Sequence, residues 1–158
     1  MIDKLKMLLK VKKLKEAEAL KLMQMQRVKE REARSAADRS RIVVEQNAAT
    51  LEPRSDALYA EIIGKTVDLT CLDELKLRLV AMQKDHDRLK DKLQRDELAH
   101  EKADSALKLA VRDHDERVRA SQKYLILTDD LMGTIIRGIE HAEEAETEDR
   151  VARGRRPE

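Results

Sequence analysis

Two glycines near the carboxyl end of the chain, Gly133 and Gly138, have the spacing of the glycines in a phosphate-binding loop. In such a loop a lysine and a hydroxyl residue must follow the second glycine, because they reach the phosphate and its magnesium ion. Here Ile139 and Glu140 stand at those two positions. The sequence therefore lacks this kind of nucleotide-binding loop, and we expect no cofactor.

The histidines offer a second possible chemistry, metal binding. His100 and Glu101 resemble the start of a zinc-protease helix, but Asp104 stands where that helix needs its second histidine. His86, His100 and His114 recur every 14 residues, which separates neighbours by about 21 Å along a helix. They cannot share one ion, so we expect no metal site.

The remaining polar residues do not form a catalytic group either. His86 and His114 each stand between two aspartates, but sequence neighbours on a helix point to different faces. Cys71 has no histidine beside it, and a single cysteine permits no internal disulfide. We therefore expect no catalytic residue and a protein that is not an enzyme. The histidines are better explained as partly buried helix positions that set register or partner choice.

The composition shows what kind of scaffold carries these residues. Alanine, glutamate, lysine, leucine and arginine make up 56% of the 158 residues, a bias typical of coiled coils and long helices. Four glycines, two prolines and no phenylalanine or tryptophan leave too little for a turn-rich strand fold. We expect an all-α protein.

The positions of glycine and proline divide the chain into two helices. Residues 1–52 and 65–132 contain neither residue, so long helices can continue there without interruption. We predict a helix over about 2–63 with a break or kink near Pro53, a turn over about 64–70 with Thr70 as N-cap, and a helix over about 71–141. Near-equal lengths favour an antiparallel coiled-coil hairpin over residues 1–142, followed by a disordered charged tail over 143–158.

The second predicted helix has a countable heptad pattern. From Leu72 the pattern comprises two stripes: Leu72, Leu79, His86, Leu93, His100 and Leu107, and Leu75, Met82, Leu89, Asp96, Ala103 and Ala110. Near Leu107 the pattern slips by four residues, a stutter, and continues as Val111, Val118, Leu125, Met132 and Ile139, beside His114, Ser121, Thr128, Ile135 and Ala142. The first helix is less regular, with apolar residues at Ile2, Leu5, Leu8, Val11, Leu14, Leu22, Met25 and Val28.

Charge is unevenly distributed along the chain. Residues 1–50 carry a net charge of +6, residues 51–140 of −3 and residues 141–158 of −2. The basic start could attract nucleic acid or an anionic membrane, but residues 1–50 contain no aromatic residue to stack on bases or anchor at a membrane. We expect a solvated face or an acidic protein partner, with no specific nucleic acid. No run of about 18 apolar residues and no signal-peptide core is present, so we expect a cytoplasmic protein without a transmembrane segment.

Two stretches of the sequence resemble the YscO proteins of type III secretion systems, the virulence relatives of the flagellar protein FliJ. The first begins with Ile2-x-x-Leu5 and continues as Val11-Lys12-Lys13-Leu14-Lys15-Glu16 and Ala17-x-Ala19-Leu20. The second is Leu72-Asp73-Glu74-Leu75-x-x-x-Leu79-x-x-Met82. The length, the basic start and the acidic end are also similar, so the resemblance covers most of the chain.

The resemblance implies a two-helix antiparallel coiled coil that acts as a stalk. Such a stalk docks in the pore of the hexameric secretion ATPase and links it to the membrane export gate, at the cytoplasmic side of the bacterial inner membrane. Translocator chaperones are further partners that the resemblance implies. From this resemblance we expect a non-enzymatic, monomeric hairpin. The alternative is a homodimeric coiled-coil scaffold, in which the heptad stripe faces a second chain.

The resemblance also assigns candidate contact residues. The gate-facing cluster of the family has the spacing i, i+4, i+7, i+11, which here gives Leu75, Leu79, Met82 and His86. Leu75 replaces the family's leading aromatic residue, and all four positions also fall on the heptad stripes, so packing within the hairpin is the competing interpretation. The ATPase-facing residues near the amino terminus would include Lys4, Lys6, Lys10, Lys12 and Lys13.

Overall fold

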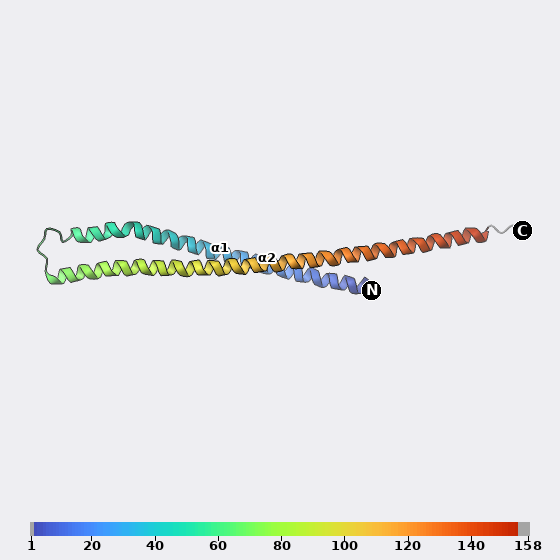
Figure 1. Cartoon of the computed structure of the whole chain (residues 1–158), viewed down its shortest axis with the longest axis horizontal. Coiled ribbons are helices and arrows are strands. Elements are labelled where there is room, and N and C mark those ends of the chain that lie inside the picture. The colour runs from blue at the N-terminus through green and yellow to red at the C-terminus, as the bar shows by residue number, and fades with distance from the viewer. Residues whose placement is uncertain (1, 155–158) are drawn as a thin grey trace. The chain divides into compact units, whose positions relative to one another are not determined.

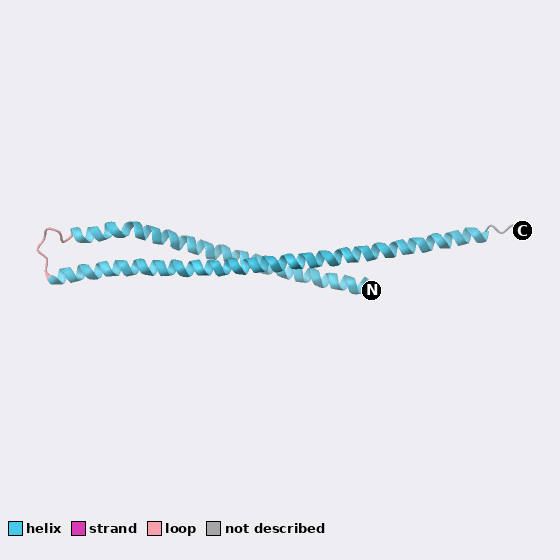
Figure 2. Ribbon diagram, in the orientation of Figure 1, coloured by secondary structure: helices cyan, strands magenta, loops and turns pink. Residues whose placement is uncertain are grey.

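Two long helices and one loop account for the described part of the chain. The computed structural model describes residues 2–154, in which α1 spans Ile2–Ala60 and α2 spans Leu69–Gly154 (Figures 1 and 2). No strand occurs within residues 2–154. The predicted all-α, two-helix fold is therefore confirmed.

The helices contribute to two compact units. The loop unit comprises Gln24–Leu109, and the terminal unit comprises the chain up to Met23 and from Ala110 onward. In the loop unit the helices run antiparallel. Glu30 contacts His100, and Asn47, which comes later in α1, contacts His86, which comes earlier in α2. In the terminal unit they are also antiparallel, because Lys12 lies over Tyr124 and Glu16 meets Ser121. Each unit is thus a pair of antiparallel helical segments.

A glycine and an aspartate fix the loop between the helices, residues 61–68. Gly64 has a φ of 79°, a conformation that favours glycine and commonly follows a helix end. Asp68 then caps α2, because its carboxylate accepts the backbone N–H of Leu69 at 2.8 Å and the hydroxyl of Thr70 at 3.2 Å. The predicted N-cap at Thr70 is therefore wrong, since Thr70 itself donates to the capping aspartate.

The first helix passes through Pro53 without interruption. Proline removes one backbone hydrogen bond from a helix, and the neighbouring backbone is supported by side chains. Thr50 Oγ1 donates to the carbonyl of Gln46 at 3.1 Å, and Arg54 Nε donates to the carbonyl of Thr50 at 3.2 Å. A short separate helix beginning at Pro53, one of the two predicted outcomes, is therefore wrong, and α1 ends at Ala60.

The second helix extends past its predicted end near residue 141 to Gly154. The predicted disordered tail, 143–158, is thus helical over 143–154, and residues 155–158 lie outside the described residues. The helix continues because alanine, glutamate and arginine are strong helix formers and no glycine or proline occurs between Gly138 and Gly154. An i,i+4 pair also supports it, since Arg150 Nη2 lies 3.2 Å from Glu146 Oε1.

The inward face of α2 keeps one heptad register. From Leu72 onward, every position of the heptad pattern with alternating spacings of three and four residues is buried or half-buried as far as Leu131. Beyond Leu107 these positions are Ala110, His114, Arg117, Ser121, Tyr124, Thr128 and Leu131. The predicted four-residue slip near Leu107 is therefore wrong, because the slipped stripe is only half-buried at Val111 and Val118 and is exposed at Leu125, Met132 and Ile139.

Polar side chains on α1 explain why this register persists in the terminal unit. Lys12 Nζ lies 5.3 Å from the centroid of the Tyr124 ring, a cation–π contact typically worth about 0.5–1 kcal/mol at exposed sites. Ser121 Oγ donates to the carboxylate of Glu16. A slip by four residues would keep Ser121 inward but would turn Tyr124 away from Lys12. We call the inward positions along which the two helices pack the seam. Its register in the terminal unit thus follows hydrogen bonding and ring contact rather than hydrophobicity alone.

The inward face of α1 has its own heptad register, which differs from the apolar pattern noted in the sequence. In the terminal unit the positions are Ile2, Leu5, Leu9, Lys12, Glu16, Ala19 and Met23. Leu8, Val11 and Leu14 are exposed instead. Small residues dominate the most buried positions of both units, including Ala19, Ala37, Ala110, Ser40, Ser121 and Thr128. The helices can approach closely at these positions, because the interaxial distance depends on the side chains at the contact.

Candidate functional site

The stripe assigned to the export gate lies on the face of α2 that packs against α1. Leu75 and His86 are only 8% and 5% exposed, and Leu79 and Met82 are half-buried. The structure brings all four residues onto one face, as their spacing predicts. It also covers that face with α1, as the competing interpretation of packing within the hairpin predicts.

His86 is held within the hairpin by a hydrogen bond to α1. Its Nδ1–H donates to Oδ1 of Asn47, with 2.9 Å between the two atoms. Asn47 belongs to the inward register of α1 but was not among the residues predicted from the sequence. It could have been found by counting the alternating spacing of three and four residues from Leu5 and Leu9. The buried histidine and the half-buried asparagine form a polar pair at matching heptad positions, a device that can set helix register.

We predict opposite effects for single and double substitutions of this pair. His86→Leu or Asn47→Leu alone removes one hydrogen-bonding partner, and we expect the free energy of unfolding to fall by about 1–3 kcal/mol. The double variant leaves neither polar group unpaired, so its stability should return to near or above wild type. Urea unfolding of the four proteins measures this. Additive losses would mean that the two side chains are not coupled in solution.

Leu79 and Met82 reach the surface through an open groove of the loop unit. The groove is lined by residues from both helices: Leu51, Glu52, Ser55, Tyr59, Leu79, Met82 and Gln83. Tyr59 at its edge is 44% exposed. Of the four stripe residues, Leu79 and Met82 are thus the two that line an open groove.

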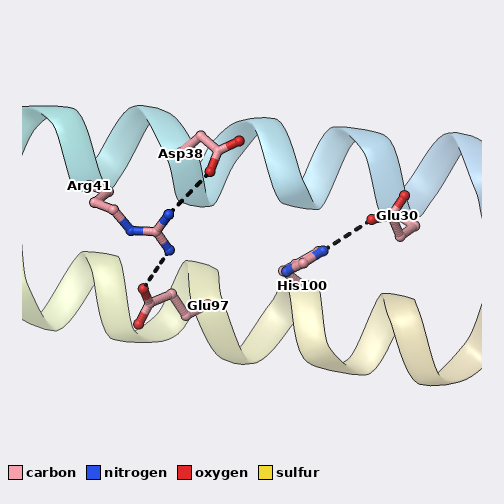
Figure 3. A network of polar contacts seen from close by, with 5 residues as sticks. All are labelled: Glu30, Asp38, Arg41, Glu97 and His100. Carbon is pink, nitrogen blue, oxygen red and sulfur yellow. Dashed lines mark hydrogen bonds and ion pairs between the residues drawn. The ribbon is translucent and has the colours of Figure 1, made fainter.

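The remaining inward histidines make separate polar contacts. His100 Nε2 donates to Oε1 of Glu30 across the loop unit, at 3.0 Å (Figure 3). His114 Nδ1 lies 3.7 Å from Oδ1 of Asp115 on the same helix. Among the described residues, no group of three or more histidine, cysteine or acidic side chains could hold a metal ion. These histidines therefore belong to pairwise contacts.

A second polar contact crosses the loop unit beside His100. Arg41 contacts Glu97 at 3.0 Å and Asp38 at 3.4 Å (Figure 3). The hydrogen bond to Glu97 is the main cause of a raised pKa of the Arg41 guanidinium. On α2, a hydrogen bond from Lys108 lowers the pKa of the Asp104 carboxyl. All of these groups are substantially exposed, and exposed pairs contribute little to stability.

The structure divides the five lysines that were predicted to face the ATPase. Lys6, Lys10 and Lys13 follow each other at i, i+4 and i+7, so they share one exposed face of α1. Lys4 lies elsewhere around the helix, and Lys12 is half-buried over the Tyr124 ring. We call Lys6, Lys10 and Lys13 the basic face. This face can offer three ammonium groups to an acidic surface, whereas Lys12 is already engaged with α2.

Two other sequence features have simple positions. Gly133 and Gly138 lie inside α2, where the backbone is helical rather than looped. Cys71 is exposed in the first turn of α2. Within the described residues, neither helix contains an apolar stretch long enough to span a bilayer.

Comparisons with known proteins identify related chains. The family model described as "Type III secretion protein YscO" matches residues 5–153. A 2.8 Å crystal structure of the type III secretion protein YscO from Vibrio parahaemolyticus has a similar fold, with a TM-score of 0.81 and 18% sequence identity. The similarity covers 94% of this chain and 93% of that chain. No curated protein sequence matches this chain.

Proposed function

The chain belongs to the YscO family of type III secretion proteins, and we propose that it is a non-enzymatic stalk and escort component of the secretion apparatus. In this proposal it links the hexameric secretion ATPase to the cytoplasmic domain of the export gate. It works in the cytoplasm, at the periphery of the bacterial inner membrane. The observation that carries the proposal is the family match over nearly the whole chain, together with the paired antiparallel helices.

The basic face of α1 is our proposed ATPase contact. Lys6, Lys10 and Lys13 are exposed on one side of the helix, and their ammonium groups suit an acidic ring surface. Lys4 lies about 160° around the helix from Lys6, nearly opposite this face, and Lys12 supports the surface by packing on Tyr124. Contacts of this kind accelerate association and orient the stalk. Nucleotide-dependent changes in the ATPase ring would then shift the conformational equilibrium of the export gate. This requires that each end of the stalk binds some conformations of its partner more tightly than others.

The open groove of the loop unit is our proposed gate contact. Leu79 and Met82 would meet the gate directly, because both line this groove. Leu75 and His86 would act through packing, because both are buried against α1. Translocator chaperones are further proposed partners. A scaffold whose heptad stripe faces a second chain is disfavoured, because α1 of the same chain occupies that stripe.

The gate contact is tested with Met82→Glu. We expect this variant to bind the purified cytoplasmic domain of the cognate gate protein at least about tenfold more weakly, because a charge replaces an apolar contact. Lys84→Glu, an exposed position two residues away, serves as the control and should bind like wild type. Calorimetric titration measures the affinities. Equal binding by the Met82 variant, with unchanged helicity, would contradict this contact.

A further inference from the structure

The terminal unit carries an apolar stripe beside the seam of its two helices, and most of this stripe is exposed. The stripe consists of five aliphatic residues spaced by seven along α2: Val111, Val118, Leu125, Met132 and Ile139. Val111 and Val118 are half-buried, and the other three are exposed. A seven-residue spacing keeps side chains on one face of a coiled coil. We call this set the outer stripe.

The outer stripe is more apolar than the seam beside it. The seam of α2 in this unit includes His114, Arg117, Ser121 and Thr128, whereas every member of the outer stripe is aliphatic. The hairpin thus buries the more polar register and exposes the more hydrophobic one. Exposed apolar residues that are aligned on one face and bordered by charged residues are typical of an interaction site.

The outer stripe runs between a basic and an acidic edge. Val111, Val118, Leu125 and Met132 each follow a seam residue of α2 by four positions. On α1, Lys6 and Lys13 follow the seam residues Ile2 and Leu9 by four. In an antiparallel pair, positions with this offset lie on the same side. Lys15 and Leu22 lie on the opposite side, where they line a groove with Asp113 and Arg117. The α1 edge of the stripe is therefore basic.

The other edge belongs to α2 itself. The positions one helical turn after Val111, Val118, Leu125 and Met132 are Asp115, Gln122, Asp129 and Ile136. All four are exposed and lie on the side of the stripe away from α1. Two of the four are aspartates and none is basic. This face of the terminal unit thus presents a basic edge, an apolar centre and an acidic edge. A face with this order is complementary to a copy of itself turned by 180°.

We propose that the free chain pairs with a second copy through the outer stripe. A two-fold axis along the helices places α2 parallel to the partner's α2, so that each stripe residue meets its own counterpart. The same axis sets Lys6 and Lys10 opposite the partner's Asp129. An axis perpendicular to the helices would instead bring the two basic edges together. Charge complementarity therefore favours the parallel arrangement. This arrangement is isologous, so it forms a closed dimer and not a longer assembly.

Pairing also has a consequence that rests on the proposed function. Lys6 and Lys10 belong both to this interface and to the proposed ATPase contact. The dimer and the ATPase complex would then exclude each other, and the dimer would be the reserve form of the free chain. The pairing is tested on the free chain alone, so its failure leaves the proposed ATPase contact untouched.

Sedimentation equilibrium tests the pairing. We expect a concentration-dependent mass between 18.2 kDa and twice that value. Leu125→Glu should weaken self-association at least about tenfold, because it places a charge at the centre of the stripe. Ile126→Glu is the matched control, since Ile126 is also exposed but lies about 100° further around the helix. A monomer at all concentrations up to about 100 μM, or equal effects of both variants, would overturn the pairing.

Disulfide cross-linking tests its direction, in a Cys71→Ser background. If the helices are parallel, Val118→Cys and Met132→Cys should each form a disulfide-linked dimer when oxidised alone, and Lys123→Cys should not. If only a mixture of the Val118 and Met132 variants cross-links, the arrangement is antiparallel and the proposed one is wrong. Cross-linking of Lys123→Cys at an equal rate would show random collision and would also overturn it.

Discussion

Reversing the basic face, by Lys6→Glu, Lys10→Glu and Lys13→Glu together, should reduce stimulation of the cognate secretion ATPase to near its basal rate. The three side chains are exposed on one side of α1, so the change replaces an attractive surface by a repulsive one. We expect the apparent affinity to fall by about tenfold or more at physiological ionic strength. Phosphate release by the ATPase, titrated with each protein, measures the effect.

The triple variant should remain folded, which makes its loss of stimulation interpretable. Lys12 is left in place because it packs over Tyr124. The matched control reverses three exposed lysines of the loop unit, Lys84, Lys90 and Lys102. It changes the net charge equally and should keep full stimulation. Full stimulation by the basic-face variant would exclude this surface.

Leu75→Asp should cause the largest loss of stability among single substitutions near the loop. Leu75 is 8% exposed in the seam. Removing a buried leucine typically costs about 2–5 kcal/mol, and leaving an unpaired carboxylate in its place adds to that cost. We expect the free energy of unfolding to fall by at least about 3 kcal/mol. Urea unfolding followed by circular dichroism measures it.

A substitution two residues away provides the control for this prediction. Leu77 is 69% exposed on another face of α2, so Leu77→Asp should change the stability by no more than about 0.5 kcal/mol. The difference in stability between the Leu75 and Leu77 variants distinguishes packing within the hairpin from a surface that is free to bind a partner. If Leu75→Asp unfolds like Leu77→Asp, the residue is a free surface available to a partner, and the packing described for the loop unit is not maintained in solution.

The fold could be predicted from the sequence because its main determinants are local. Long stretches without glycine or proline predicted the two helices, and the heptad count from Leu72 identified Leu75 and His86 as inward positions. Both are buried. The N-cap was misplaced because Asp68 and Thr70 are both good capping residues, and only the folded chain shows that Asp68 accepts the hydrogen bonds that Leu69 and Thr70 donate.

The register of the terminal unit could not be predicted from hydrophobicity. Counting apolar residues there selects Leu125 and Met132 on α2 and Leu8 on α1, all of which are exposed. The inward positions instead hold Lys12 and Tyr124, which contact each other across the pair. Polar cross-helix contacts depend on both helices at once. A pattern read along one helix therefore cannot reveal them.

The candidate site was predictable only in part for the same reason. The spacing of Leu75, Leu79, Met82 and His86 correctly placed them on one face, but spacing alone could not show which of them line an open groove. Likewise, a cluster of lysines in the sequence could not show that Lys12 turns inward whereas Lys6, Lys10 and Lys13 stay together outside. Both distinctions depend on where the second helix lies.

The most direct test of the proposed stalk function is to mix the full chain with the cognate secretion ATPase. Size-exclusion chromatography with light scattering would report complex formation, and nucleotide hydrolysis would be followed in the same samples. We predict that the chain co-elutes with the ATPase and raises its rate of hydrolysis. A chain that elutes separately and leaves hydrolysis unchanged would contradict a stalk function.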